Sequence, residues 1–185
     1  MISDILSDAE SKMKGAVEHA REEFAAIRTG RAHPAMFNKL MVDYYGSPTP
    51  LQQLATFQVP EARTVLISPF DRASMAGVEK AIRDSDLGVN PANDGNVIRV
   101  VMPQLSEERR REYVKLARTK AEEARVSVRN IRRHANDAVH KLVKDKDVGE
   151  DDARTAEKSL DGSTKKYVDA IDELLKAKEA ELLEV

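Results

Sequence analysis

The sequence predicts an α+β protein, in which a long antiparallel three-helix bundle carries a small β/α/β domain inserted between its first and second helices. Residues 1–30 and 105–185 repeat apolar side chains at helical steps of three and four. Residues 31–104 are instead rich in proline and hold five of the eight aromatic residues. We therefore expect residues 1–30 and 105–185 to form the bundle and residues 31–104 to form the insertion.

Each bundle helix has its own start or stop signals. The first stripe begins at Ile2 and ends near Thr29-Gly30, shortly before Pro34. Ser106 is a suitable N-cap for a second helix that runs to about residue 146. After a turn at residues 147–149, acidic residues open a third helix, where they complement the helix dipole.

The insertion alternates strand and turn signals. Short strands are predicted within residues 39–46, 54–59, 64–70 and 96–103, and a helix within residues 73–88 that is closed by Gly88. The segment at residues 89–95 has turn chemistry. The chain crosses between the two predicted domains twice, and both crossings carry Gly or Pro, which favours a hinge. The predicted hinge residues are Gly30, Arg31, Ala32, His33, Pro103, Gln104 and Leu105.

Composition argues against several classes of protein. Cysteine is absent, so disulfides, thiolate catalysis and zinc-thiolate sites are ruled out. No apolar run is long enough for a membrane span, and the first residues lack secretory and transit patterns, so we expect a cytoplasmic protein. The four histidines are dispersed, and "GSTKK" at residues 162–166 lacks phosphate-loop spacing. We therefore expect no enzyme activity, no metal and no cofactor.

Charge is strongly segregated along the chain, although the net charge is only −2. Residues 105–146 hold 13 basic against 7 acidic residues, and residues 147–185 hold 6 against 12. Five arginines of the second helix follow steps of 7, 7, 4 and 3 and so share one face, which we call the arginine line: Arg111, Arg118, Arg125, Arg129 and Arg132. Arg133 flanks this line.

The arginine line admits two interpretations. At 100° per residue it lies about 100° to 130° from the apolar stripe, so we expect it to face away from the acidic third helix, with Glu122 as its one acid. Guanidinium groups suit bidentate phosphate contacts, and a face without aromatic rings favours recognition of folded RNA by shape and phosphates. The alternative is a solvated face whose arginines form salt bridges within the bundle.

Six segments resemble one family in order and spacing. They are "IRTGRA" (27–32), "YYGSPTPL" (44–51), "FDRASMAGVEKAI" (70–82), "LGVNPANDGNVIRVVMP" (87–103), "LSEERR" (105–110) and "VRNIRRHAND" (128–137). Together they are similar to the ribosome recycling factor family over essentially the whole chain. The resemblance implies a translation factor that binds the post-termination ribosome and, with elongation factor G and GTP, splits it into subunits.

The same resemblance implies particular partners and residues. The bundle would lie against large-subunit ribosomal RNA through Arg129, Arg132 and Arg133, with Arg28 and Arg31 as contacts at the hinge end. We add Arg118 and Arg125 of the arginine line to these expected RNA contacts. We expect a monomer that binds no nucleotide itself, and the alternative function is a coiled-coil adaptor for an acidic protein.

Overall fold

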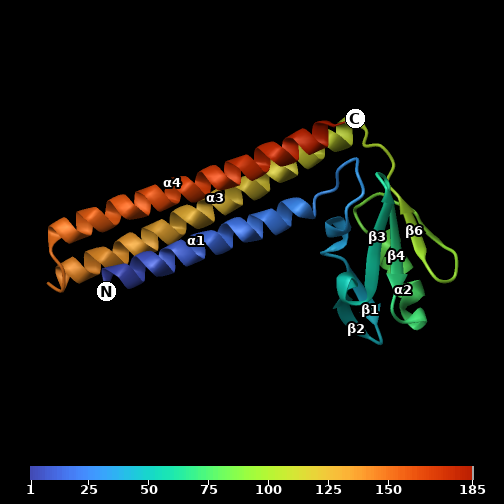
Figure 1. The fold of residues 1–185 in the computed structure, drawn as a ribbon, viewed down its shortest axis with the longest axis horizontal. Coiled ribbons are helices and arrows are strands. Elements are labelled where there is room, and N and C mark those ends of the chain that lie inside the picture. Colours follow the sequence, from blue (N-terminus) through green and yellow to red (C-terminus); the bar gives the residue numbers. More distant parts are fainter. Residues whose placement is uncertain (185) are drawn as a thin grey trace. The chain divides into compact units, whose positions relative to one another are not determined.

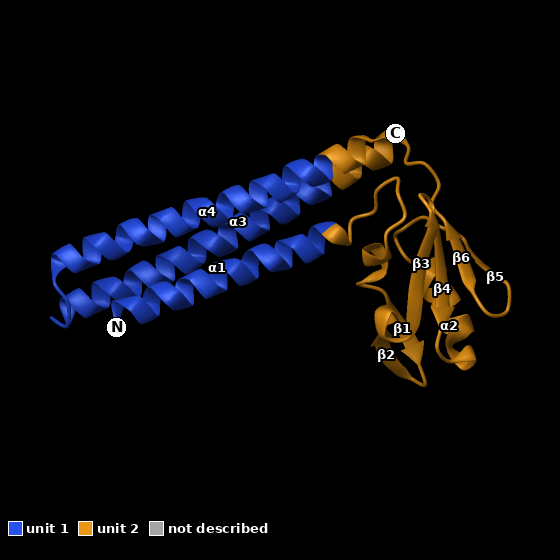
Figure 2. Cartoon of the chain, viewed as in Figure 1, with its two compact units in different colours: residues 1–24, 115–179 blue, residues 25–114, 180–185 orange. Residues whose placement is uncertain are grey.

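The computed structural model describes residues 1–184, which form two compact units (Figure 1, Figure 2). Unit 1 comprises Met1–Phe24 and Lys115–Glu179, and unit 2 comprises Ala25–Val114 and the residues from Ala180 onward. Each of the three breaks between the units falls inside a helix. The sequence-based bounds at residues 30 and 105 therefore differ from the compact units, because the ends of all three long helices belong to unit 2.

Three long helices carry the bundle. They are α1 (Ile2–Ala25), α3 (Glu107–Lys144) and α4 (Glu150–Leu183). The start of α3 is capped as expected, since the backbone N–H of Arg109 donates to the Ser106 hydroxyl at 3.1 Å. The first helix ends at Ala25, four residues before the predicted stop at Thr29-Gly30, and Ile27 is nevertheless buried.

Alanine takes half of the buried apolar positions in the described core of unit 1. The buried positions follow the predicted helical stripes and are Ala9, Met13, Val17, Ala20 and Phe24 on α1, Ala117, Ala121, Ala124, Val128, Ala135 and Val139 on α3, and Ala153, Ala156, Leu160, Tyr167 and Ile171 on α4. Alanine presents little more than its methyl group, so helices that meet through alanine pack closely along a thin seam. The larger buried side chains between these alanines, among them Met13, Leu160 and Ile171, interlock the helices.

A polar cluster joins α4 to α1 at the edge of this seam. Glu10 accepts hydrogen bonds from the hydroxyls of Tyr167 and Ser163, the latter at 2.8 Å, and Lys166 lies 3.6 Å away. The hydrogen bond from Tyr167 is the main cause that lowers the pKa of Glu10, followed by the one from Ser163. The same bond raises the pKa of Tyr167 to about 12. The ionised carboxylate is thus the form that the fold stabilises.

Unit 2 contains a four-stranded antiparallel sheet with strand order β3-β4-β6-β5. Its strands are β3 (Ala55–Glu61), β4 (Thr64–Pro69), β5 (Pro91–Asn93) and β6 (Ile98–Val101). Val65 and Ile67 of β4 alternate inward with Ile98 and Val100 of β6, and all four are fully buried. The sheet joins the middle of the insertion to its end, because β4 pairs with β6.

Two sequence-based assignments in unit 2 were wrong. Residues 91–93, predicted as part of a turn, form β5, which pairs with β6 at the edge of the sheet. The helix predicted to reach Gly88 is α2 (Met75–Arg83), and it ends five residues earlier. Gly88 does adopt a positive φ of 67°, but it lies in the connection that leads to β5.

A separate two-stranded sheet, β1 (Met41–Tyr44) and β2 (Ser47–Pro50), packs on α2. Sequence analysis predicted β1 but missed β2, whose two prolines are tolerated because the strand lies at an edge. Helix and strand approach closely at Gly77, where an added Cβ would lie 3.2 Å from the Asp43 carbonyl oxygen and 3.3 Å from Val42 Cγ1. The hydroxyl of Tyr44 also donates to Asp71 at 2.8 Å.

Replacing Tyr167 with Phe tests the polar cluster in the bundle. We expect Tyr167→Phe to lower the free energy of unfolding by about 1 kcal/mol at neutral pH, because the buried ring keeps its packing while Glu10 loses a hydrogen bond. The depressed pKa of Glu10 adds stability above the ordinary carboxylate pKa of about 4.3, and this stability is lost as pH falls through the folded-state value.

Urea unfolding followed by circular dichroism, at neutral pH and again near pH 3, measures this difference. The gap between Tyr167→Phe and the unmodified chain should narrow in acid, since Glu10 is then protonated in both proteins. A gap of the same size at both pH values would contradict the assigned role of Glu10.

Candidate nucleic-acid interface

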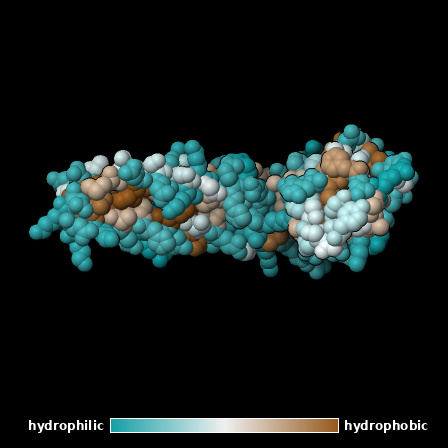
Figure 3. All heavy atoms as spheres, turned by 90° about the horizontal axis from the view of Figure 1, so that it is seen from below, coloured by the Kyte–Doolittle hydropathy of each residue, from teal (hydrophilic) through white to brown (hydrophobic). Residues whose placement is uncertain are grey.

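The arginine line lies on α3, and its members differ in exposure. Arg118 has 65% of its side chain exposed, Arg129 has 49%, Arg132 has 41% and Arg125 has only 20%. On the face of the molecule shown in Figure 3, hydrophilic residues cover most of the surface and separate the apolar patches. The cationic groups therefore dominate the chemistry of this part of α3.

Acidic side chains of α4 pair with three of these arginines. Arg118 Nε lies 2.7 Å from Glu179, Arg125 Nε lies 2.7 Å from Asp172, and Arg132 Nη1 lies 3.1 Å from Asp161. The arginine numbers rise while the acid numbers fall, as expected for antiparallel helices. We call these three pairs the arginine–carboxylate ladder.

The ladder contradicts the predicted direction of the arginine line. Sequence analysis placed the line away from α4, with Glu122 as its one acid, and the structure shows it beside the α3–α4 seam. The acids are spaced 11 and 7 residues apart on α4, which are near-whole numbers of helical turns, so they share one face. An angle of 100° to 130° from the apolar stripe was read as outward, but a long arginine side chain at that angle reaches the neighbouring helix.

Arg125 is the most strongly held member of the line. It donates to Asp172 and also to Glu122, at 3.0 Å from the latter. Partial burial lowers the pKa of Arg125, but the hydrogen bonds to Asp172 and Glu122 outweigh this effect and leave the pKa raised. Its guanidinium is thus already surrounded by negative charge on its own bundle.

Arg129 and Arg133 are the least engaged by carboxylates. Arg129 reaches Glu122 only at 3.4 Å, and Arg133 donates to the side-chain amide of Asn130 at 2.7 Å. At the other end of the line, Arg111 pairs with Glu107 one turn earlier on the same helix, at 2.7 Å. The donors most available to an anion are therefore those of Arg129 and Arg133.

Arg28 is buried, contrary to what an RNA contact would require. Only 4% of the residue is exposed, its guanidinium donates to the Pro103 carbonyl, and its Nε has no hydrogen-bond partner among the described residues. Burial lowers the pKa of Arg28, and the nearby Arg109 adds to this effect while Tyr113 opposes it. Arg28 therefore ties the end of α1 to the second predicted crossing.

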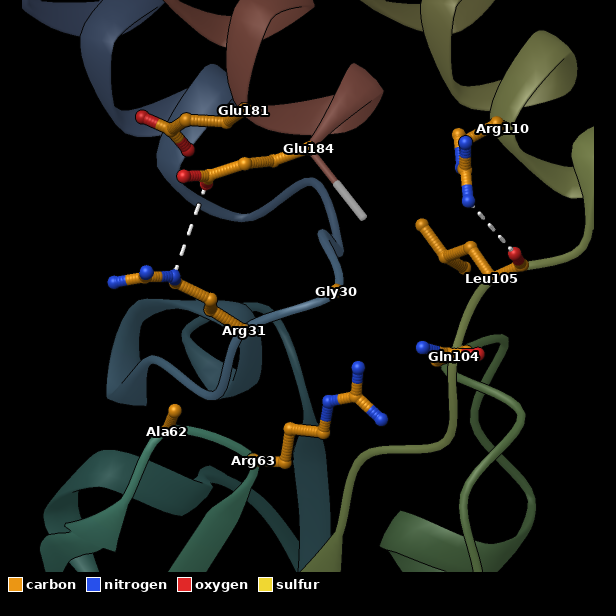
Figure 4. A pocket seen from close by; sticks show the side chains of 9 residues that line it. All are labelled: Gly30, Arg31, Ala62, Arg63, Gln104, Leu105, Arg110, Glu181 and Glu184. Carbon is orange, nitrogen blue, oxygen red and sulfur yellow. Dashed lines mark hydrogen bonds and ion pairs between the residues drawn. The ribbon is translucent and has the colours of Figure 1, made fainter.

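Arg31 behaves differently, because it is exposed and lines a charged pocket within unit 2. Figure 4 shows its side chain between Glu181 and Glu184 above and Arg63 below, while Arg110 lies across the pocket beside Leu105. Arg31 Nε lies 3.7 Å from Glu184. Sequence reasoning did not find Arg63 as a neighbour of Arg31, because only the sheet brings these residues together.

The predicted hinge residues lie inside unit 2, and backbone hydrogen bonds hold several of them. The N–H of Ala32 donates to the Ala62 carbonyl at 2.7 Å, and the N–H of Met102, next to Pro103, donates to the Arg63 carbonyl at 2.6 Å. Leu105 is buried, whereas Gln104 is exposed. The two crossings are thus both fastened to the turn between β3 and β4.

The described residues, 1–184, contain no group of three or more acidic or histidine side chains that could hold a metal ion. None of their helices is long and apolar enough to cross a membrane. His140 contacts Glu157 at the bundle surface, and His134 is exposed. The arrangement is suited to binding anions through guanidinium groups.

The contrast between Arg28 and Arg31 is directly testable. We expect Arg28→Ala to lower the free energy of unfolding by about 2 kcal/mol, because the Pro103 carbonyl loses its buried partner. Arg31→Ala serves as the matched control and should change it by less than about 0.5 kcal/mol, since 72% of its side chain is exposed. Chemical denaturation of both variants measures the difference, and equal losses would contradict the structural role of Arg28.

The family model described as "Ribosome recycling factor" matches residues 20–183. The chain is 70% identical over 184 residues to the ribosome-recycling factor of Cutibacterium acnes, and the alignment covers all of both chains. It is 67% identical over 183 residues to that of Kocuria rhizophila, with 99% of each chain covered.

Solved structures agree with the sequence comparisons. A solution structure of ribosome recycling factor superposes with a TM-score of 0.76 at 44% identity, covering 100% of this chain and 98% of that one. A second match, with a TM-score of 0.70, 40% identity and full coverage of both chains, is the T. thermophilus ribosome recycling factor, shown with E. coli elongation factor G bound to the E. coli post-termination complex. Sequence motifs, fold and relatives therefore agree that this chain belongs to the ribosome recycling factor family.

Proposed function

We propose that this chain binds the post-termination ribosome and, together with elongation factor G and GTP, splits it into subunits for reuse. The observation that carries the proposal is the full-length match to ribosome recycling factors, one of which is placed with elongation factor G on a post-termination complex. The full-length coverage matters because both the bundle and the insertion are present, and each has a counterpart in those relatives.

The RNA-binding surface in this proposal is the exposed face of α3. Arg129 and Arg133 make the first contacts, since carboxylates engage them least. Arg118, Arg125 and Arg132 contribute from the arginine–carboxylate ladder. Arg31 of unit 2 is proposed as a separate RNA contact, because its side chain is exposed. Arg28 is not proposed as a direct contact, because its burial leaves no face for a phosphate.

The insertion acts in this proposal as a separate part that elongation factor G can displace. We propose residues 1–30 and 105–185 as the RNA-binding domain, residues 31–104 as the hinged domain, and Gly30–His33 and Pro103–Leu105 as the hinge. The GTP chemistry belongs to the partner, so the chain itself is no enzyme and needs no cofactor. It acts as a monomer in the cytoplasm. The alternative of an adaptor for an acidic protein has no support among the relatives.

Arg133 offers a sharp test of the RNA-binding face. We expect Arg133→Gln to weaken binding to purified large ribosomal subunits about three- to tenfold at low salt, and to reduce the slope of log affinity against log salt by about one, because one phosphate contact is lost. Lys14→Gln is the matched control: it removes one positive charge from an exposed position on α1.

Co-sedimentation with large subunits across a salt series gives both affinity and slope. Equal effects of Arg133→Gln and Lys14→Gln would show that general charge, and not this face, governs binding. Subunit splitting is measured separately by light scattering of post-termination ribosomes, which should fall only when the chain, elongation factor G and GTP are all present.

A further inference from the structure

The arginines proposed to bind RNA already bind carboxylates of their own bundle. Glu179, Asp172 and Asp161 of α4 take donors of Arg118, Arg125 and Arg132 at 2.7, 2.7 and 3.1 Å. A carboxylate and a phosphate both present oxygens to the planar guanidinium in the same way. An RNA phosphate that approaches these arginines must therefore share or replace an existing acidic partner.

The ladder is accessible enough for such an exchange. The pair of Arg132 and Asp161 is the most open, with 41% and 62% of the side chains exposed. Arg118 keeps 65% exposed against 27% for Glu179, and Asp172 keeps 49% against 20% for Arg125, so the middle pair gives way last. Exposed ion pairs contribute little to stability, so replacing the acid with another anion costs the fold little.

The chain thus has two classes of cation on one helix face. Arg129 and Arg133 are open to an anion at once, since one contacts a carboxylate only at 3.4 Å and the other contacts an amide. The three ladder arginines become available only when their acids give way. Successive ladder arginines are seven residues apart on α3, which is about 10 Å at 1.5 Å per residue.

We propose that Asp161, Asp172 and Glu179 determine RNA specificity by competing with phosphates for the ladder arginines. This inference rests on the proposed function, because it assumes that the arginine face binds ribosomal RNA. A flexible or unrelated RNA can bind Arg129 and Arg133. It gains little binding free energy from a ladder arginine, because each new phosphate contact displaces a carboxylate. A rigid surface whose phosphates match the spacing of the ladder displaces several acids in a single binding event.

The competition predicts that removal of the acids loosens specificity. In the double variant Asp161→Asn/Glu179→Gln, Arg132 and Arg118 lose these acidic partners while the amides keep the shape of the side chains. We expect binding to bulk transfer RNA, used as a non-specific RNA, to tighten roughly fivefold at low salt. Binding to purified large ribosomal subunits should tighten less, so the ratio of the two affinities should fall.

A matched control separates competition from overall charge. Asp152→Asn/Glu173→Gln removes the same two negative charges from exposed positions of α4 that form no ion pair with the arginine line within the described residues. Screening limits the effect of distant charges, so this control should change either affinity by less than about twofold. Circular dichroism confirms that both double variants keep the helical fold.

Three outcomes decide the matter. A selective gain for transfer RNA in Asp161→Asn/Glu179→Gln over the control supports competition. Equal gains in both double variants would sink it, and so would weaker binding in the ladder variant, which would show that the acids position the arginines. The Arg133→Gln measurement reports on the proposed function separately: if it weakens large-subunit binding while the ladder variant matches its control, the RNA face survives and the competition does not.

Discussion

A thin alanine seam is the constraint on which the rest of the bundle depends. Positions such as Ala121, Ala124 and Ala156 allow the helices to pack closely, but their small side chains interlock weakly. Polar contacts at the edges of the seam help to fix the axial register between the helices, because each joins one defined residue on a helix to one on its neighbour. Lys120 reaches Glu23 between α3 and α1 at 3.5 Å, and Glu10 joins α1 to α4.

Between α3 and α4 the polar contacts are made by arginines, and the same arginines are proposed to bind RNA. Lysine would also pair with Asp161 or Asp172, but the planar guanidinium keeps further donors available when one is engaged. Arginines held in this way are balanced by carboxylates within the fold, and Arg118 and Arg132 still keep 65% and 41% of their side chains exposed. The small net charge of the chain is therefore a poor guide to its electrostatics, since opposite charges lie side by side on neighbouring helices.

The sequence predicted the elements that have strong periodicity or clear caps. The three long helices, the Ser106 cap and the strands around Val65 and Ile98 follow from local patterns that tertiary contacts reinforce. Local patterns failed where a partner strand decides the outcome: β5 is only three residues long and contains Pro91, so its pairing with β6 leaves no periodic signal.

The candidate site was harder to predict than the fold. The spacing of the arginines predicts which of them form the arginine line. It does not predict their acidic partners, because the sequence of one helix does not reveal which neighbouring helix its side will face. The steps of 11 and 7 between Asp161, Asp172 and Glu179 were the available signal, and it becomes readable only once α3 and α4 are aligned antiparallel. The residues around Arg28 do not predict its burial, because its hydrogen-bond acceptor, the Pro103 carbonyl, lies 75 residues later in the sequence.

Gly77 marks a close approach between α2 and the hairpin of β1 and β2. The hairpin of β1 and β2 shares no sheet with the other four strands, and α2 is the element it packs on. At the closest point the helix meets the backbone of Asp43 where a methyl group would intrude. A side chain larger than hydrogen at residue 77 would force α2 away from the hairpin, so the glycine sets how near the two can lie.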